Sequence, residues 1–374
     1  MKMMELTPSD DVQKLIASRM REVLKHQQFI NGPEVAQLET EMASFTNSKY
    51  AVGCSSGTDA ILLALKALGV KPGDRIITVP FTFMGTIEPI LLCGAIPVFV
   101  DVRADTFNLD TRKLEELLRF PGRFVGIIAV DLFGLPADYH EINRIAQKFG
   151  LWVIEDAAQS MGAKYKGEWA GSLATIGCTS FYPTKPLGCY GDGGMCFTDR
   201  EELAMAMRRF QNHGQQGKYC HVDIGWNARL DTIQAAVLLA KLTVLETELI
   251  ERWFVAAEYS EKLQDVGVRL PITPLGLISS WAQYAIVFDT MADRSAVIEV
   301  LNDRQIPYDI HYPAPLHFQP AIVSLGISGE NLEVSEFLAN HILSLPIHPY
   351  LSMPDINTVA NAINYALCAS SKKN

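Results

Sequence analysis

A lysine between two prolines is the residue of this sequence with the clearest chemical potential. Lys185 lies in the segment Ser180-Phe-Tyr-Pro-Thr-Lys-Pro-Leu-Gly188, among aromatic and small residues and with no other cation in the segment. Such surroundings favour burial, and burial lowers the pKa of an amine. A neutral amine can form a Schiff base with a carbonyl compound. Taken alone, however, a buried lysine is more often a structural residue paired with an acid.

Two further segments could bind a phosphate and a cationic ring. In Cys54-Ser-Ser-Gly-Thr-Asp59 a strand is followed by a helix, so the backbone N–H groups of Gly57 and Thr58 could bind a phosphate. Ser180 could add a hydroxyl to the same phosphate. Asp156 follows an apolar strand, at the edge of a parallel sheet where α/β proteins bind ligands, and could hold a proton on a ring nitrogen. An ordinary helix N-cap explains either segment equally well when each is taken alone.

The three segments together supply a phosphate cradle, an acid for a pyridinium nitrogen and an imine-forming lysine, in that order along the chain. This is the set of groups that pyridoxal phosphate requires, since the protein tunes the ring while the cofactor performs the organic chemistry. Glycines between residues 188 and 194 would let the backbone approach such a flat ligand closely. The sequence therefore predicts a pyridoxal 5'-phosphate site.

These segments need a layered scaffold, and the hydrophobic pattern predicts an α/β fold with a mostly parallel sheet. Short β-branched runs alternate with helical periods over residues 34–250. The expected strands are 50–54, 75–79, 96–100, 125–130 and 151–155, and the expected helices are 59–68, 86–93, 112–119 and 139–149. After residues 229–236 a long helical pattern runs to about 255, and a strand at 284–289, a helix at 295–304 and a terminal helix follow.

The length and this change of pattern predict more than one domain, because single cores stop growing at roughly 250 to 300 residues. We predict an N-terminal arm over residues 1–33, a large three-layer α/β/α cofactor domain over 34–250, and a smaller C-terminal α/β domain over 251–374.

The composition excludes several other classes of protein. A chain of 374 residues that is 48% hydrophobic and 20% charged is neither a disordered tail nor a disulfide-stapled miniprotein. The net charge of -10 and the lack of a basic stripe argue against nucleic-acid binding. Seven cysteines without a CxxC pair and a start that does not resemble a signal peptide favour a reducing, cytoplasmic location. Prolines and glycines break the apolar region 76–100, so no membrane span is predicted, and no metal site is expected.

Over essentially its whole length, the chain resembles the DegT-like nucleotide-sugar aminotransferases. The matching motifs occur in the order expected for that family and in combination are highly specific. They are Gly32-Pro-Glu-Val35, Leu38-Glu39, Ser56-Gly-Thr-Asp-Ala60, Pro80-Phe-Thr-Phe83, Glu155-Asp-Ala-Ala-Gln-Ser160, Ser180-Phe-Tyr-Pro-Thr-Lys-Pro-Leu-Gly188, Gly191-Asp-Gly-Gly194 and Asn227-Ala-Arg-Leu-Asp231.

This resemblance implies the aspartate-aminotransferase fold, type I among pyridoxal phosphate enzymes, and a homodimer whose active sites lie at the subunit interface. It implies that Lys185 forms the Schiff base with the cofactor. The remaining cofactor contacts that it implies are Ser56, Gly57, Thr58 and Ser180 at the phosphate, Asp156 at the ring nitrogen, Gln159 at the phenolic oxygen, Phe83 stacked on the ring, and Asn227 at the phosphate of the neighbouring subunit.

Within the family, the chain is similar to enzymes that use L-glutamate to aminate C3 of a UDP-linked 3-keto-N-acetylglucosaminuronic acid for surface polysaccharide. Arg229 suits this substrate class, because a guanidinium binds a carboxylate through two parallel hydrogen bonds. Without the resemblance, a surface salt bridge to Asp231 or to another neighbour would explain this arginine better. The resemblance also implies that His311 and Tyr312, in His311-Tyr-Pro313, line the sugar site.

Four other functions are compatible with parts of the sequence. A relative acting on a neutral 3-keto or 4-keto deoxysugar, linked to dTDP or UDP, would leave Arg229 without a sugar carboxylate to bind. Dehydratases of the same family replace the Schiff-base lysine, whereas Lys185 is present. A nicotinamide-dependent oxidoreductase would suit the α/β pattern, but no GxGxxG follows an expected strand. A regulator without catalytic activity would be expected to carry a fused DNA-binding segment, and none is recognised.

Overall fold

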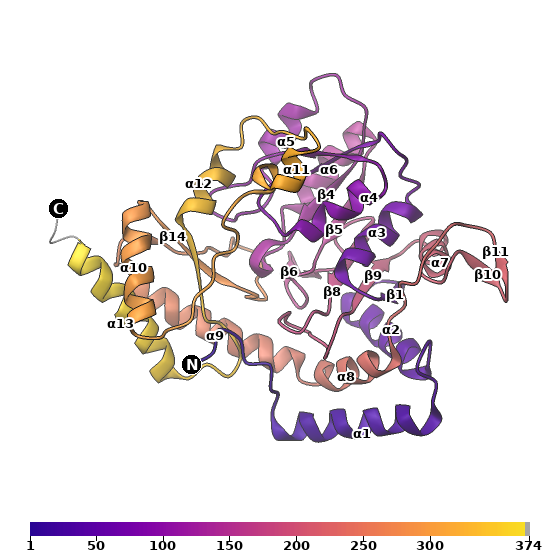
Figure 1. Ribbon diagram of the computed structural model, residues 1–374, viewed down its shortest axis with the longest axis horizontal. Helices are drawn as coiled ribbons and strands as arrows, with labels where there is room; N and C mark the ends of the chain where they lie inside the picture. The colour runs from indigo at the N-terminus through magenta and orange to yellow at the C-terminus, as the bar shows by residue number, and fades with distance from the viewer. Residues whose placement is uncertain (371–374) are drawn as a thin grey trace.

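Seven strands form the central sheet of the protein, in the order β1-β9-β8-β5-β4-β2-β3. Figure 1 shows the computed structural model, which describes residues 1–370. Strand β9 is antiparallel to both of its neighbours, and the other neighbouring strands pair in parallel. These strands are β1 (Tyr50–Cys54), β2 (Arg75–Thr78), β3 (Ile96–Phe99), β4 (Phe124–Val130), β5 (Trp152–Asp156), β8 (Ile176–Ser180) and β9 (Gly194–Thr198). The prediction of an α/β fold with a mostly parallel sheet is confirmed.

Helices cover both faces of this sheet and extend beyond it (Figure 1). Those of the first 250 residues are α1 (Asp10–His26), α2 (Pro33–Thr46), α3 (Gly57–Ala67), α4 (Glu88–Leu92), α5 (Thr111–Leu117), α6 (Tyr139–Phe149), α7 (Glu201–Phe210) and α8 (Thr232–Leu242). The later ones are α9 (Leu245–Leu263), α10 (Met291–Asp303), α11 (Pro320–Val323), α12 (Glu333–His341) and α13 (Met353–Ser370). No helix among residues 1–370 is long and apolar enough to cross a membrane.

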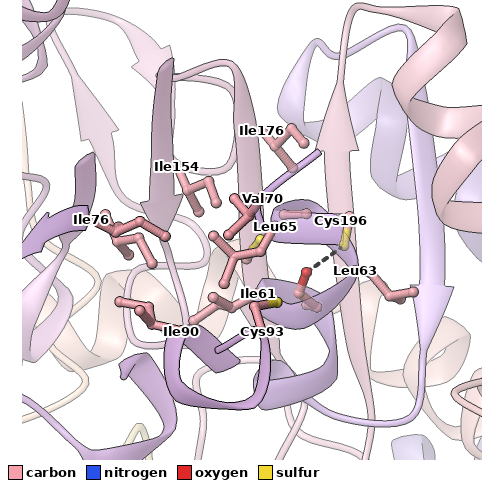
Figure 2. Packing of buried hydrophobic residues seen from close by; sticks show 14 of the residues in the cluster. Ile61, Leu63, Leu65, Val70, Ile76, Ile90, Cys93, Ile154, Ile176 and Cys196 are labelled. Carbon is pink, nitrogen blue, oxygen red and sulfur yellow. Dashed lines mark hydrogen bonds between the residues drawn. The ribbon is translucent and has the colours of Figure 1, made fainter. Parts of the chain in front are cut away.

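The three layers follow from the alternation of side chains along the strands, because successive residues point to opposite faces of a sheet. Ile76 and Ile128 belong to one buried cluster, whereas the adjacent Ile77 and Ile127 belong to another. Figure 2 shows the first cluster, in which Ile61 and other residues of α3 pack against isoleucines of the central strands. Full burial of each such side chain contributes about 1.5 to 3 kcal/mol.

The long helical pattern after residue 229 is two helices, so the expectation of one continuous helix to about residue 255 was wrong. Helix α8 ends at Leu242 and α9 begins at Leu245. The Thr243 hydroxyl donates a hydrogen bond to the Ala240 carbonyl at the break. Both helices bury apolar residues on either side of the break, and hydrophobic periodicity alone therefore does not reveal it.

A second, three-stranded antiparallel sheet follows, made of β12 (Val268–Arg269), β14 (Tyr284–Phe288) and β15 (Ile342–Leu345). Side chains of α9, α10 and α13 pack with this sheet in one buried cluster. Ala285 and Val287 of β14 belong instead to a cluster with the central sheet. The boundary predicted at residue 250 falls within α9, and the division into arm, large domain and small domain remains a prediction.

Short strands outside these two sheets form two further pairings. Strand β6 (Lys164–Tyr165) lies between β7 (Glu168–Trp169) and β13 (Leu277–Ile278), which links the central part of the chain to its later part. Strands β10 (Gln215–Gly217) and β11 (Cys220–His221) form a hairpin. This hairpin projects at the end of the molecule opposite α10 and α13 (Figure 1).

A buried carboxylate joins the central sheet to α12. Asp101 follows β3, is 1% exposed, and accepts hydrogen bonds at 2.9 Å from the backbone N–H groups of Val334 and Ser335 in the first turn of α12. The ammonium of Lys113 also donates to it at 2.9 Å. This carboxylate therefore satisfies helix-end donors that have no partner within the helix.

We expect Asp101→Ala to destabilise the protein by on the order of 3 kcal/mol, because it leaves several buried donors without an acceptor. Urea unfolding of the purified protein would measure the change. Asp289→Ala is the control. Within residues 1–370 the exposed Asp289 side chain pairs only with Arg269, so this substitution should cost less than about 1 kcal/mol. Equal losses in the two variants would contradict the role given to Asp101.

Candidate active site

A cavity of about 540 Å³ opens where β1, β2, β5 and β8 end. Because parallel strands end at the same edge of a sheet, segments distant in sequence meet there. The structure brings ten of the predicted site residues to this cavity: Ser56, Gly57, Thr58, Phe83, Asp156, Gln159, Ser180, Lys185, His311 and Tyr312. The other two, Asn227 and Arg229, do not line it.

Lys185 lies in the turn that follows β8, where its backbone N–H donates to the Tyr182 carbonyl at 2.9 Å. The side chain keeps some solvent contact through the cavity, but protein atoms surround the amine closely. Burial lowers the pKa of Lys185, and the negative charge of Asp156 partly opposes this effect. The neutral amine needed for Schiff-base chemistry is therefore easier to reach than in an exposed lysine.

Asp156 is the last residue of β5 and is 5% exposed. Its carboxylate accepts hydrogen bonds from the Thr86 hydroxyl at 2.8 Å and from the Ala158 N–H at 3.2 Å. Burial raises the pKa of Asp156, while these hydrogen bonds and the charge of Lys185 lower it. A cationic ring nitrogen beside the carboxylate would favour its ionised form further.

The start of α3 provides a close-fitting cradle. The Ser56 side chain caps the helix by accepting from the Asp59 N–H at 3.0 Å. A Cβ atom at Gly57 would lie 2.7 Å from the Cβ of Ser180, so only glycine allows the helix start and the end of β8 to approach this closely. Backbone N–H groups of a first helical turn together with a serine hydroxyl suit a phosphate.

Gln159 is held in one orientation by neighbours on two sides. Its Oε1 accepts from the Phe133 N–H at 2.7 Å, and its Nε2 donates to the Tyr312 hydroxyl at 3.1 Å. The carboxamide therefore directs its N–H groups, rather than its oxygen, toward the cavity that it shares with Tyr312. This is the orientation required to donate to a phenolic oxygen.

The other side of the cavity is aromatic. Phe83 is 61% exposed, and its ring centroid lies 6.5 Å from that of Tyr312. His311 Nδ1 lies 3.0 Å from the Ser344 hydroxyl, and its Nε2 lies 3.5 Å from the Asp309 carboxylate. Burial lowers the pKa of His311. A flat ligand placed against Phe83 would thus meet His311 and Tyr312 from the C-terminal part of the chain.

Asn227 and Arg229 lie on an extended segment whose backbone bridges to Asn212 and Cys54. Ala228 is buried between them, whereas Asn227 is exposed and Arg229 is half-buried. The alternation shows that Asn227 and Arg229 face the same side of this segment. Within residues 1–370, no salt bridge joins Arg229 to Asp231. A surface salt bridge to Asp231 therefore does not explain this arginine.

The sequence reasoning missed several residues that line the cavity. Thr86 holds the Asp156 carboxylate, but its place at the start of an expected helix gave no chemical signal. Gln283 precedes β14 and reaches the cavity from a segment more than 90 residues after Lys185, so no local pattern could have found it. Tyr182 and Asp192 also line the cavity and flank Lys185 within motifs that were recognised only as a whole.

A pair of buried carboxyl groups lies behind this site. Asp131 accepts from the Ser160 hydroxyl at 2.7 Å and from the Tyr139 hydroxyl at 2.8 Å, and Glu155 accepts from the Gly171 N–H at 2.6 Å. Burial raises the pKa of Asp131 to about 7 and also raises the pKa of Glu155, where the nearby Asp131 charge adds to the effect. One of the two groups therefore retains a proton below about pH 7.

A lysine with a lowered pKa, a buried acid and a phosphate cradle on one sheet edge form the equipment of a Schiff-base enzyme of the α/β class. The chain belongs to the DegT/DnrJ/EryC1/StrS aminotransferase family, whose model matches residues 10–364. The resemblance predicted from the motifs is thus confirmed, and the chain is an aminotransferase.

Individual relatives match over nearly their full length. The UDP-2-acetamido-2-deoxy-3-oxo-D-glucuronate aminotransferase of Pseudomonas aeruginosa is 45% identical, over 93% of this chain and 95% of the relative. The crystal structure of a DegT DnrJ EryC1 StrS aminotransferase from Brucella abortus has a TM-score of 0.90 and 42% identity, with 95% of this chain and 96% of that chain covered. NtdA from Bacillus subtilis, solved with bound cofactor PMP, has a TM-score of 0.89 and 30% identity, over 96% of this chain and 83% of that chain. The predicted aspartate-aminotransferase fold is confirmed by these neighbours.

We expect the protein to lose stability as the pH rises from about 4 to about 7, in part because of Asp131. Its folded pKa lies above the ordinary value of 3.8, so the folded protein binds more protons in this window and its stabilising contribution is complete only below it. Asp131→Asn should therefore reduce the difference in unfolding free energy between pH 5 and pH 7 by up to a few kcal/mol.

Urea unfolding at both pH values measures this difference. Asp303→Asn, at an exposed position at the end of α10, is the control and should leave the pH dependence unchanged. A wild-type pH dependence retained in Asp131→Asn would show that Asp131 does not contribute to it.

Proposed function

We propose that this chain binds pyridoxal 5'-phosphate and transfers an amino group from L-glutamate to C3 of a UDP-linked 3-keto-N-acetylglucosaminuronic acid. The proposal rests on one observation, namely that Lys185, Asp156, the α3 cradle and Gln159 all line the same cavity. The 45% identity with the Pseudomonas aeruginosa enzyme supports the substrate, and the PMP bound to NtdA supports the cofactor.

The cavity residues fit this cofactor. Ser56, Gly57, Thr58 and Ser180 would bind its phosphate, where the lack of a Cβ at Gly57 permits the close approach described above. Gln159 would donate to its phenolic oxygen, and the exposed Phe83 would stack on its ring. When bound, pyridoxal phosphate supplies an electron sink for negative charge that develops at carbon.

Two residues would handle protons during the reaction. Asp156 keeps the ring nitrogen protonated, since a carboxylate in a buried site favours a neighbouring positive charge strongly. Lys185 would move a proton between the α-carbon of the amino acid and C4' of the cofactor, first as base and then as acid. Burial lowers its pKa, which makes the neutral, proton-accepting form easier to reach than in an exposed lysine.

Arg229 and Asn227 would act in the active site of a second copy of this chain. They face one side of their extended segment and do not line the cavity of their own chain. Asn227 would there bind the cofactor phosphate. Exposed apolar residues on and beside the β10–β11 hairpin, Tyr219 at 82% and Ile224 at 90%, fit a surface that a partner covers. We therefore assign a homodimer with shared active sites.

Arg229 supports a substrate that carries a carboxylate. Within residues 1–370 its guanidinium forms no salt bridge, and its one hydrogen bond is donated to the neutral side chain of Asn212. Its Nε is buried without an acceptor. A cation left unneutralised in its own chain suits an anionic ligand, whereas a neutral keto-sugar would make no use of it. His311 and Tyr312 would contact the sugar from the C-terminal side of the cavity.

An amino-uronic acid product is suited to the synthesis of bacterial surface polysaccharide, such as the O-antigen of lipopolysaccharide. A cytoplasmic location agrees with free thiols at all seven cysteines.

Purified protein should be yellow and should lose this colour when L-glutamate is added. In Lys185→Ala, borohydride should no longer attach the cofactor covalently to the chain, because the amine that binds it is absent. Absorbance spectra and the mass of the reduced protein measure both effects. Lys166→Ala, at an exposed position, is the control and should behave as wild type. Attachment at another lysine in Lys185→Ala would refute the assignment.

Arg229→Ala should reduce kcat/KM for the keto-uronic acid substrate by about 10- to 100-fold, the range expected for loss of a charge-assisted bidentate contact. It should reduce kcat/KM for the corresponding neutral keto-sugar by less than about 3-fold. Steady-state kinetics with both sugars measure the two values. Arg200→Ala is the matched control, since among the described residues 1–370 the side chain of this exposed arginine pairs only with Glu202. Equal losses with both sugars would indicate a role in donor binding or structure.

A further inference from the structure

Asn212 lies at the junction of three segments near Arg229. It follows α7, and its N–H donates to the Arg209 carbonyl at 3.1 Å while its own carbonyl accepts from the Gln215 N–H at 3.1 Å. Its backbone also bridges to that of Asn227. The backbone of Asn212 is therefore held by α7, by the β10–β11 hairpin and by the segment that carries Arg229.

The side chain of Asn212 has a defined orientation. Its Nδ2 donates to Gln215 Oε1 at 3.2 Å, and its Oδ1 accepts from Arg229 Nη1 at 2.6 Å. Because the nitrogen is engaged with Gln215, the oxygen is directed at the guanidinium. In an antiparallel pair with Asn212 opposite Asn227, Arg229 is the diagonal neighbour, which brings its side chain within reach.

The partner of Arg229 is neutral, unlike the partners of nearby arginines. Arg209 pairs with the Asp223 carboxylate at 3.0 Å, and Arg208 pairs with Glu39 at 2.8 Å. Across the part of the chain that the structure describes, no carboxylate lies within 4.0 Å of the Arg229 guanidinium. An amide oxygen orients a guanidinium without neutralising its charge.

Enough donors remain on Arg229 to bind a carboxylate. A guanidinium has five N–H groups, of which Nε carries one and each Nη carries two. Nε is buried, and Asn212 takes one N–H of Nη1, which leaves three N–H groups on the two Nη atoms. A bidentate contact with a carboxylate needs two of them.

We propose that Asn212 is a positioning residue for recognition of an anionic sugar. It fixes the Arg229 guanidinium so that the Nη edge is presented to a carboxylate, and as a neutral side chain it leaves the arginine's charge available. The inference rests on the proposed function, since it specifies how that site would select uronic acids over neutral sugars.

The test compares binding of UDP-glucuronic acid and UDP-glucose, which differ in a carboxylate against a hydroxymethyl group. Calorimetry on the cofactor-loaded protein gives Kd without any need for turnover. Wild type should bind UDP-glucuronic acid at least about 10-fold more tightly than UDP-glucose. Asn212→Asp keeps the side-chain shape but pairs with Arg229, and should reduce this preference to about 2-fold or less while the Kd for UDP-glucose stays within about 2-fold.

Two controls separate orientation of Arg229 from other effects of an added charge. Gln216→Glu adds the same charge at an exposed position of the hairpin and should retain the preference. In an Arg229→Ala background, Asn212→Asp should cause no further change. Direct repulsion of the ligand by the new carboxylate would instead make UDP-glucuronic acid bind more weakly than UDP-glucose in the double variant, and would overturn the inference.

The inference is also overturned if wild type shows no preference for the carboxylate, or if Asn212→Asp keeps the full preference at an unchanged thermal midpoint. Failure of the proposed function has a separate signature, namely the absence of glutamate-induced bleaching in wild type. Loss of preference in Asn212→Asp together with intact bleaching by glutamate would support the role assigned to Asn212.

Discussion

An amine and a carboxylate line one cavity at the edge of the central sheet, and much of the fold serves to hold them there. Burial lowers the pKa of Lys185 and raises that of Asp156, and the charge on each group opposes the shift of the other. Strand β5 ends at Asp156 and the neighbouring β8 leads into the Lys185 turn, so the parallel sheet brings both to one edge. Thr86 then fixes the carboxylate by a hydrogen bond of 2.8 Å. The site can therefore supply a neutral amine and still hold a cationic ring nitrogen.

One turn helps to tie the C-terminal part of the chain to this edge. Phe133 donates its N–H to Gln159 and accepts from the Gln283 N–H, while the Gly134 carbonyl accepts from the Ser280 N–H at 2.9 Å. Gly134 has φ of 99°, and a Cβ there would lie 2.5 Å from the Ser280 hydroxyl. Orientation of the Gln159 amide and placement of the segment before β14 thus depend on the same few backbone groups.

The predictions of elements and of cavity residues succeeded where the signal was local. The capping serine before α3, the apolar strand before Asp156 and the proline-flanked Lys185 each indicated, within about ten residues, an element and a residue that lines the cavity. The prediction of one helix was wrong where α8 and α9 divide, because the two helices share a continuous hydrophobic pattern. The partner of Arg229 is another such case, since Asp231 is closer in sequence but Asn212 is the residue that contacts it.

The sequence by itself determined the α/β class, the family and ten residues of the cavity, because helix caps, strand patterns and motif spacing are local properties of the chain. Only the tertiary structure decided that Gln159 directs its N–H groups to the cavity, that Thr86 and Gln283 join the site, and that a neutral amide orients Arg229. Such features depend on which distant segments meet at a sheet edge or across a strand pair. Hydrogen bonds between residues far apart in the chain leave no periodic pattern in the sequence. They can be identified only in the folded structure.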